Sequence, residues 1–411
     1  MVQYIGTAAN ARRRRRRPSS VGLDESPLLA RLDWTLLLAS AALVGYGLWA
    51  IGGITRHVVP GDPNYYLSRQ FVFVAVGLIA MIAMIAIDPE WYRRSMRGIY
   101  VVLLGTLAIV LLAGSVSRHS RRWIDVSFFR FQPSEFGKIL LVLFLAAFLA
   151  DRLNRIEDFR VPLTAVALAI PPILLVFAQP DLGSALVYVA ALGACLFVSG
   201  TRWSHLALFA GAALFLAMAV LWLLPSAGIQ VLHPYQKNRL TGFLSPSSDP
   251  KGDTYNINQA LIAVGSGGVS GRGTTQSTQT NLDYLPESQT DFAFAAFAEQ
   301  RGFLGVSGLL LLYLLVVWRG LKIVTIARDG FSAIVAAGVV FAFVFQIFVN
   351  VGMTIGLAPV TGITLPFVSV GGSSLIASMA MIGLLQGIHA RGRPRRTLAP
   401  GPSFLSRRPR C

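Results

Sequence analysis

Long apolar runs alternate with short polar segments along most of the chain. Each run is about long enough to cross a hydrocarbon layer of about 30 Å, which takes roughly 20 residues of helix. Such segments must be helical, because every backbone polar group in lipid needs a partner inside the protein. The runs lie near residues 34–54, 70–87, 99–116, 136–150, 162–178, 183–199, 205–225, 302–321, 331–353 and 373–389. The pattern predicts an all-α, polytopic membrane protein with about ten transmembrane helices.

Composition strengthens this prediction. Of the 411 residues, 54% are hydrophobic and 13% are charged, which is too apolar for a soluble domain of this length. The chain has 2 cysteines, Cys195 inside an apolar run and Cys411 at the end, and this pair predicts no disulfide framework.

Basic side chains mark one side of the membrane, and the formal net charge is +17. An even number of spans puts both termini on the same side, and arginines fill both terminal segments. The short connections on that side are also basic, at residues 93–97, 152–160, 202 and 319–328. The positive-inside rule therefore predicts cytoplasmic tails at 1–33 and 391–411 and a membrane bundle at 34–390.

The six-arginine run at residues 12–17 allows two interpretations. Contact with anionic lipid headgroups explains it better than nucleic-acid binding, because the run lies on the side that the other basic residues mark. It is not a secretory signal, since the apolar run that follows is long enough to span the membrane.

The outer segment 117–138 is strongly basic, which breaks the positive-inside rule. An anionic ligand such as a phosphate or pyrophosphate explains Arg121, Arg122 and Lys138 most simply, because an arginine side chain presents a planar fork to phosphate oxygens. The alternative is that these side chains pair with lipid headgroups or with nearby carboxylates, and both options stay open.

Polar residues also stand close to the outer helix ends. Trp123 is either an interfacial belt residue or a platform on which a sugar stacks. Glu135 and Lys138 have i,i+3 spacing, which suits a structural pair or a functional pair at membrane depth. Asp181 and Ser373 stand at helix starts, where capping and close packing are alternatives to substrate contact.

The longest outer loop, near residues 227–290, is expected to be functional because of its length. Its glycine cluster at residues 265–273 permits close backbone approach or an anion-binding nest. Its polar candidates for substrate binding are Lys237, Arg239, Asp283 and Glu287.

Asp291 follows this loop at the point where water gives way to membrane, just before Phe292 and Phe294. Partial desolvation makes a carboxylate a better proton acceptor near neutral pH, which suits a general base. The alternative is that Asp291 caps the helix that follows.

Several motifs occur in one order along the chain. They are Arg121-Arg122-Trp123 with Arg130-Phe131-Gln132-Pro133-Ser134-Glu135, Gln179-Pro180-Asp181-Leu182-Gly183, Gly265-Ser266-Gly267-Gly268, Leu285-Pro286-Glu287 with Thr290-Asp291-Phe292, and Pro366 with Gly371-Gly372-Ser373-Ser374. With these motifs the chain resembles the SEDS family of shape, elongation, division and sporulation proteins, whose members include RodA and FtsW. The resemblance covers nearly the whole membrane region.

The resemblance implies a ten-helix peptidoglycan glycosyltransferase. Its substrate would be lipid II, the undecaprenyl-pyrophosphate-linked disaccharide peptide, polymerised on the outer face of the bacterial cytoplasmic membrane. Its partner would be a class B penicillin-binding protein, and its essential aspartate falls on Asp291. The strings 350–356, Ala298-Glu299 and 387–389 favour the elongation type, RodA, over the division type, FtsW.

The expected reaction is inverting attack by a sugar hydroxyl on the anomeric carbon of a lipid-pyrophosphate-linked glycan. Asp291 would accept the hydroxyl proton, and Arg121, Arg122 or Lys138 would balance charge on the leaving pyrophosphate. A divalent cation is an option, although no cluster has clear metal-ligand spacing, and no other cofactor is expected.

Two other functions compete with this one. A transporter that flips lipid-linked precursors would also carry polar residues at membrane depth, but the chain has no inverted repeat and its polar features gather on one side. A scaffold that only positions a partner synthase would leave Asp291 dispensable.

Overall fold

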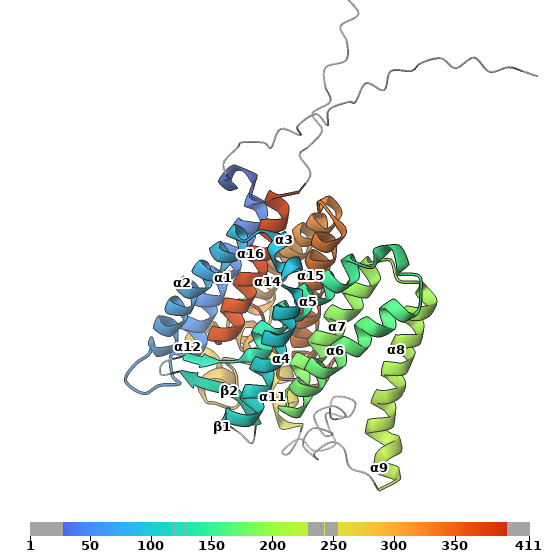
Figure 1. The fold of residues 1–411 in the computed structure, drawn as a ribbon. Coiled ribbons are helices and arrows are strands. Elements are labelled where there is room, and N and C mark those ends of the chain that lie inside the picture. The colour runs from blue at the N-terminus through green and yellow to red at the C-terminus, as the bar shows by residue number, and fades with distance from the viewer. Residues whose placement is uncertain (1–27, 118–119, 127–128, 229–241, 243–253, 393–411) are drawn as a thin grey trace, which may run out of the picture. The chain divides into compact units, whose positions relative to one another are not determined.

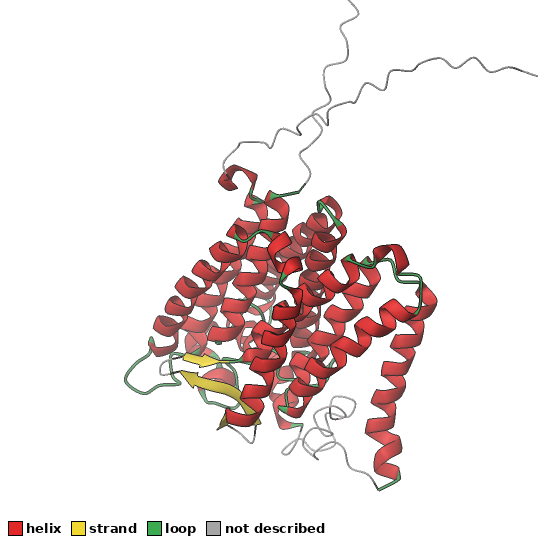
Figure 2. Ribbon diagram, in the orientation of Figure 1, coloured by secondary structure: helices red, strands yellow, loops and turns green. Residues whose placement is uncertain are grey.

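The computed structural model describes residues 28–117, 120–126, 129–228, 242 and 254–392. The chain divides into a terminal unit, residues 1–31 with 394–411, and a helical unit, residues 32–393. Of the terminal unit the structure describes only a short 3-10 helix, η1 (Leu28–Arg31). The helical unit contains the site, and helices dominate it (Figure 2).

The long helices of this unit follow the predicted runs. They are α1 (Trp34–Ile54), α2 (Tyr65–Ala86), α4 (Met96–Ala113), α5 (Pro133–Ala150), α6 (Arg160–Ala178), α7 (Leu182–Val198), α8 (Trp203–Met218), α14 (Ala293–Ile326), α15 (Gly330–Thr354) and α16 (Gly372–Ala390). Among the described residues, 9 helices are long and apolar enough to cross a membrane, with α8 continuing to Ser226, and α7 is slightly shorter. The predicted all-α, polytopic fold is therefore confirmed.

Short elements connect the long helices. They are α3 (Pro89–Arg94), β1 (Ser115–Ser117), β2 (Ser120–Val126), β3 (Phe129–Phe131), η2 (Leu153–Arg155), the π-helical turn η3 (Ala219–Leu223), α9 (Leu224–Ser226), α11 (Tyr255–Ser266), α12 (Gly273–Gln276) and α13 (Thr278–Asn281).

Helices α5 and α16 form the centre of the bundle and are buried over most of their length. Helix α16 packs along α2, while α5 contacts α4, α7 and α15 (Figure 1). Small residues permit the close approach: a side chain at Gly383 of α16 would collide with the backbone of Met81 in α2. Helix α8 differs, because none of its residues is buried.

The first and last long helices meet at one end of the unit. Asp33, which caps α1, accepts hydrogen bonds from Arg319, and its backbone exchanges two hydrogen bonds with the side chain of Gln386 in α16. Arg391 donates to the last carbonyls of α2 at the same end. The meeting of the first and last long helices at one end agrees with an even number of membrane crossings. The assignment of that end to the cytoplasm stays a prediction.

The segment after α4 forms a small antiparallel sheet, in the order β1-β2-β3, that the hydropathy pattern did not predict. Asp125 pairs with Arg130 in the register of β2 and β3, and their side chains lie 3.3 Å apart. The sheet therefore holds the basic segment as a folded ribbon that leads directly into α5.

Helix α14 begins at Ala293, nine residues before the predicted run at 302–321. The helix bends at Gly302, where φ is 62° and ψ is −164°. A side chain there would collide with the backbone at Val269 and Gly271, and Phe303 donates to the carbonyl of Gly268. The glycine cluster therefore permits close backbone packing against the bend in α14. With this bend, the buried helix extends further toward the loop that precedes it.

Candidate active site

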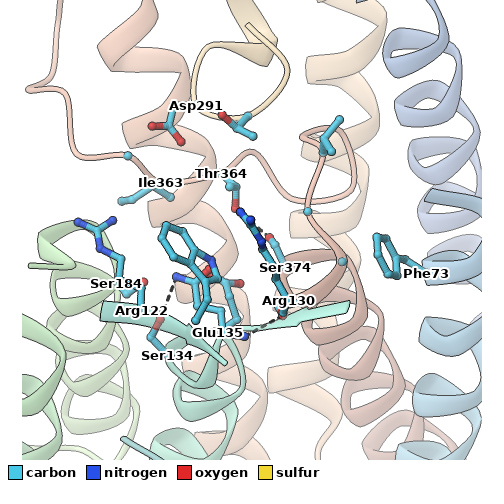
Figure 3. A pocket seen from close by; sticks show the side chains of 18 of the residues that line it. Phe73, Arg122, Arg130, Ser134, Glu135, Ser184, Asp291, Ile363, Thr364 and Ser374 are labelled. Atoms are coloured by element: carbon cyan, nitrogen blue, oxygen red, sulfur yellow. Dashed lines mark hydrogen bonds between the residues drawn. The ribbon is translucent and has the colours of Figure 1, made fainter. Parts of the chain in front are cut away.

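A cavity of about 1250 Å³ opens among the ends of these helices that the sequence predicts to face outward (Figure 3). Its walls come from α2, the β2–β3 ribbon, α5, α7, α15, the segment before α14 and the start of α16. They include Tyr65, Tyr66, Arg69, Gln70, Phe73, Arg122, Trp123, Arg130, Gln132, Glu135, Lys138, Tyr188, Glu287, Asp291, Gln346, Thr364, Ser373 and Ser374. Most of the predicted site residues that the structure describes therefore meet in one cavity.

Asp181 is the centre of a hydrogen-bond network on the α5–α7 wall. Its carboxylate caps α7 by accepting from the backbone N–H of Ser184 at 3.2 Å. Its other oxygen accepts from Ser134 Oγ at 3.0 Å and from Gln132 Nε2 at 3.1 Å. The side chain of Asp181 therefore caps α7, as predicted, and also orders residues of the cavity wall.

Arg122 extends from β2 to this network. One of its guanidinium nitrogens lies 3.9 Å from Asp181 Oδ1, and the guanidinium also donates to the carbonyls of Gln179 and Pro180. These contacts hold a cation beside the cavity in a fixed orientation. For Arg122 the structure thus contains the alternative in which the basic side chains pair with nearby carboxylates, and this pairing is compatible with a role in anion binding.

Glu135 and Lys138, one turn apart on α5, form a buried ion pair in the cavity wall. Lys138 Nζ donates to Glu135 Oε2 at 2.7 Å, and the side chains are only 3% and 8% exposed respectively. A buried pair needs excellent geometry to offset its loss of hydration. The pair therefore places a charge-paired ammonium group at the cavity surface.

Asp291 reaches the cavity from the opposite direction, across Ile363 and Thr364 from Arg122 and Glu135 (Figure 3). Its backbone carbonyl accepts from Asn350 Nδ2 at 2.9 Å. Phe292, not Asp291, occupies the N-cap position of α14. The carboxylate is therefore presented to the cavity at the entrance to a buried half-helix, which favours the proton-acceptor role over the capping alternative.

Gly362 makes room for this carboxylate. A Cβ atom at position 362 would lie 3.4 Å from Asp291 Oδ2, and the residue has φ of +74°, which glycine adopts without strain. Ser369 Oγ and the N–H of Val370 donate to the carbonyls of Thr290 and Gln289. The loop before α16 and the segment before α14 are thus tied together around Asp291.

Other predicted residues take different positions. Trp123 and Glu287 line the cavity, and Glu287 accepts from Thr290 Oγ1 at 2.8 Å. Ser373 accepts from the N–H of Gln132 and donates to the carbonyl of Arg130, so it links α16 to the ribbon. This link explains why residue 373 is polar, although its side chain does not cap α16.

Two predicted residues with described side chains do not line the cavity. Asp181 lies behind the wall that it organises, and Asp283 is exposed and absent from the wall. The backbone of Arg121 belongs to β2, opposite Val116, and its side chain lies outside the described residues, as do Lys237 and Arg239 altogether. Their roles stay predictions.

Sequence reasoning missed several polar residues in and near the cavity wall. Gln70 and Gln346 line the cavity, Asn350 donates to the carbonyl of Asp291, and all three are buried inside apolar helices. Polar residues in such helices usually face the bundle interior, and the i,i+4 spacing of Gln346 and Asn350 on α15 indicates one shared face. That pattern could have identified the two residues of α15.

Within the described residues, no group of three His, Cys, Asp or Glu side chains is arranged to hold a metal ion. The cavity carboxylates stand apart, and Glu135 and Asp181 each have a cationic neighbour. The divalent cation stays a prediction.

A family model described as "Cell cycle protein", which covers FtsW, RodA and SpoVE, matches residues 31–393. The chain belongs to this family, the SEDS family. The family match therefore includes all the motifs on which the resemblance was based.

Curated relatives of this SEDS protein have different cellular names. Stage V sporulation protein E of Bacillus subtilis is 36% identical over 373 residues, which covers 90% of this chain and 98% of that protein. Peptidoglycan glycosyltransferase MrdB of Escherichia coli is 37% identical and covers 87% of this chain and 93% of the relative. A probable peptidoglycan glycosyltransferase FtsW of Tolumonas auensis is 35% identical, covering 86% and 91% respectively.

Solved structures share the fold of this SEDS protein. A chain from a study of how a peptidoglycan synthase complex coordinates polymerization and crosslinking aligns with a TM-score of 0.71 at 31% identity, covering 87% of this chain and 97% of that one. The rod shape determining protein RodA of Thermus thermophilus aligns with a TM-score of 0.64 at 28% identity, covering 88% and 98%.

Proposed function

We propose that this SEDS protein is a peptidoglycan glycosyltransferase that polymerises lipid II. The observation that carries the proposal is the cavity, which brings the Asp291 carboxylate together with the cationic groups of Arg122 and Lys138. One proton acceptor and a cationic site for a leaving pyrophosphate are what glycosyl transfer from a lipid-linked sugar requires. Relatives named peptidoglycan glycosyltransferases support the same activity.

In this mechanism the sugar 4-hydroxyl of one lipid II attacks the anomeric carbon of a second lipid-linked glycan. A new carbon–oxygen bond forms as the bond from that carbon to the pyrophosphate breaks, and the configuration inverts. The hydroxyl proton passes to Asp291, and the bonding electron pair leaves with the lipid pyrophosphate. Fixing both reactants in one cavity also removes much of the entropic cost of their encounter.

Arg122 and Lys138 stabilise the departing pyrophosphate. Each is already paired with a carboxylate, so its position is set before substrate arrives. Preorganised charges of this kind are effective because they need little rearrangement in the transition state. The same role stays a prediction for Arg121, and a divalent cation bound to the pyrophosphate would share the work.

The proposal includes a partner and an orientation. A class B penicillin-binding protein crosslinks the strands that this protein makes; the related chain from a peptidoglycan synthase complex supports such an assembly. Both termini lie in the cytoplasm, and the cavity faces the outer side. The motif details favour the elongation type, although relatives of the sporulation, elongation and division types have similar sequence identities to this chain.

The decisive experiment is polymerisation of lipid II by the purified full-length protein, alone and with its penicillin-binding partner. Asp291→Asn should lower kcat by about 100-fold or more, because general-base catalysis contributes about that much. Asp62→Asn, at an exposed position outside the cavity wall, is the matched control and should retain activity.

Each competing function predicts a different result. A scaffold would show equal polymerisation, or none, for the wild type and Asp291→Asn when the partner is present. A transporter would move lipid II across vesicle membranes without making polymer. If the Asp291→Asn protein forms polymer at the wild-type rate, Asp291 is not the general base.

A further inference from the structure

Asn350 of α15 is a buried amide that binds two separate segments of the chain. Its Nδ2 donates to the backbone carbonyl of Asp291 at 2.9 Å and to the backbone carbonyl of Ile363 at 2.7 Å. Both hydrogens of the amide nitrogen are therefore used. Because both partners are acceptors, they also fix which end of the amide faces them. One side chain thus joins the segment before α14 to the loop before α16.

The amide carries a cost that an apolar side chain would avoid. Asn350 Oδ1 is buried and has no hydrogen-bond partner within the described residues. A buried acceptor without a partner lowers the stability of the fold. The two donated hydrogen bonds, and not packing, therefore explain an asparagine at this position. Since Asn350 is 0% exposed and does not line the cavity, it does not touch a molecule bound there.

The two carbonyls belong to the backbone on either side of the Asp291 carboxylate. One is the carbonyl of Asp291 itself. The other follows directly after Gly362, where a Cβ atom would lie 3.4 Å from Asp291 Oδ2. Asn350 therefore holds the backbone that carries the carboxylate against the backbone that the carboxylate faces.

The turn that carries Asp291 depends on contacts from outside it. Glu287, at the start of this turn, has φ of 56°, a left-handed conformation that strains a residue other than glycine. The regular hydrogen bonds of α14 begin only at the carbonyl of Phe292, so they do not fix Asp291. The three carbonyls of residues 289–291 instead each accept a hydrogen bond from a distant segment. Asn350 supplies the last of these bonds, at the residue that carries the carboxylate.

We propose that Asn350 is the positioning residue for Asp291, and that it fixes the carboxylate by holding its backbone against the loop at Ile363. This role rests on the proposed function, in which Asp291 accepts the proton of the attacking hydroxyl. Misplacing a reacting group by about 1 Å can lower a rate by about 100-fold. Loss of the tie should therefore lower kcat, and it should leave KM nearly unchanged because Asn350 does not touch the substrate.

Asn350→Leu tests this role in the purified full-length protein with its penicillin-binding partner. Leucine is close to asparagine in size and donates no hydrogen bond. Initial rates of polymerisation at several lipid II concentrations should give a kcat that is lower by about tenfold or more, with a KM close to that of the wild type. If leucine prevents folding, Asn350→Ser takes its place, because serine is too short to reach both carbonyls and should lower kcat in the same way.

Gln386→Met is the matched control. Gln386 is also 0% exposed, and it makes two hydrogen bonds to the backbone of Asp33, but it does not line the cavity or contact Asp291. Both variants should have a lower midpoint of thermal unfolding, whereas only Asn350→Leu should slow polymerisation. Equal losses of kcat in the two variants would show that the rate follows stability, and would overturn the positioning role.

A double variant separates positioning from a general structural effect. If Asn350 acts through the Asp291 carboxylate, adding Asn350→Leu to Asp291→Asn should not lower the residual rate any further. A second loss of about tenfold in the Asp291→Asn protein would mean that the two substitutions act independently. That result would overturn the positioning role.

Hydrogen exchange distinguishes this outcome from that of the proposed function. Backbone amides of residues 287–292 should exchange several-fold faster in Asn350→Leu than in the wild type, and not in Gln386→Met. Faster exchange in this turn, together with a wild type that makes no polymer, would retain Asn350 as the residue that positions Asp291 and reject the glycosyltransferase activity. Polymer formation with an unchanged kcat in Asn350→Leu would do the reverse.

Discussion

The two walls of the cavity are built on different principles. On the α5–α7 wall, charged groups are matched inside the protein: Lys138 with Glu135, and Arg122 with Asp181. On the α2 wall, Gln70 is neutral, buried and unmatched within the described residues. One wall matches its polar groups within the protein, and the other keeps a buried amide without a described partner.

This difference separates a catalytic feature from a cost to stability. Charge that develops on a leaving group is best met by ions whose positions are already fixed, because moving them during the reaction costs free energy. The paired wall therefore suits catalysis. A buried amide without a hydrogen bond has lost its hydration without compensation, so Gln70 lowers the stability of the fold.

Breaking the buried pair should have the largest effect on stability. Lys138→Met leaves the Glu135 carboxylate buried without its cation, which costs about 3–5 kcal/mol in the free energy of unfolding. Thermal unfolding in detergent measures this loss, and lipid II polymerisation measures the loss of activity.

The double variant Glu135→Met with Lys138→Met sharpens the result. It should recover most of the stability, because an apolar pair can replace a buried ion pair, but it should remain impaired in polymerisation. Full recovery of activity would mean that the pair is only structural, and that the contrast between the walls has no catalytic meaning.

A smaller effect is expected at Asp181. Asp181→Ala removes the cap of α7 and the acceptor of Gln132 and Ser134, at a cost of about 1–2 kcal/mol. Asp329→Ala is the control, since Asp329 caps α15 in the same way through Ser332 and does not line the cavity. Both should unfold at lower temperature, but only Asp181→Ala should slow polymerisation; similar losses of activity in both would break the comparison.

The smallest effect is expected at Gly362. Gly362→Ala places a methyl group near Asp291 Oδ2 and strains a residue with positive φ, at about 1 kcal/mol. Gly356→Ala has the same φ of +74° but meets only the side chain of Leu261. We expect the two variants to lose equal stability, and only Gly362→Ala to have a several-fold lower kcat. Equal kcat values for the two variants would show that the contact with Asp291 is unimportant.

The sequence predicted most helices to within a few residues, because the length of an apolar run is a local property. It predicted less well where the chain departs from that rule. The ribbon at β2 and β3 contains several charges and gave no strand pattern that stood out, and α14 begins early because its first turns are buried by the loop that precedes it. Gln70 stood at the edge of a predicted run, and nothing local distinguished it from an ordinary helix start.

The candidate site was predicted as a set of residues and not as an arrangement. Family motifs and charge placed Asp291, Arg122, Glu135, Lys138 and Asp181 near the outer ends of helices. They did not reveal that Asp181 both caps α7 and organises Gln132, because that contact joins residues 49 positions apart in the chain.

By itself the sequence determined the membrane class, the helices and the excess of basic residues on one side, since hydropathy and charge are sums over neighbouring residues. Only the tertiary structure decided which polar groups are paired and which remain open. Pairing depends on the positions of distant segments, and a buried amide is recognised as unsatisfied only when everything around it is known.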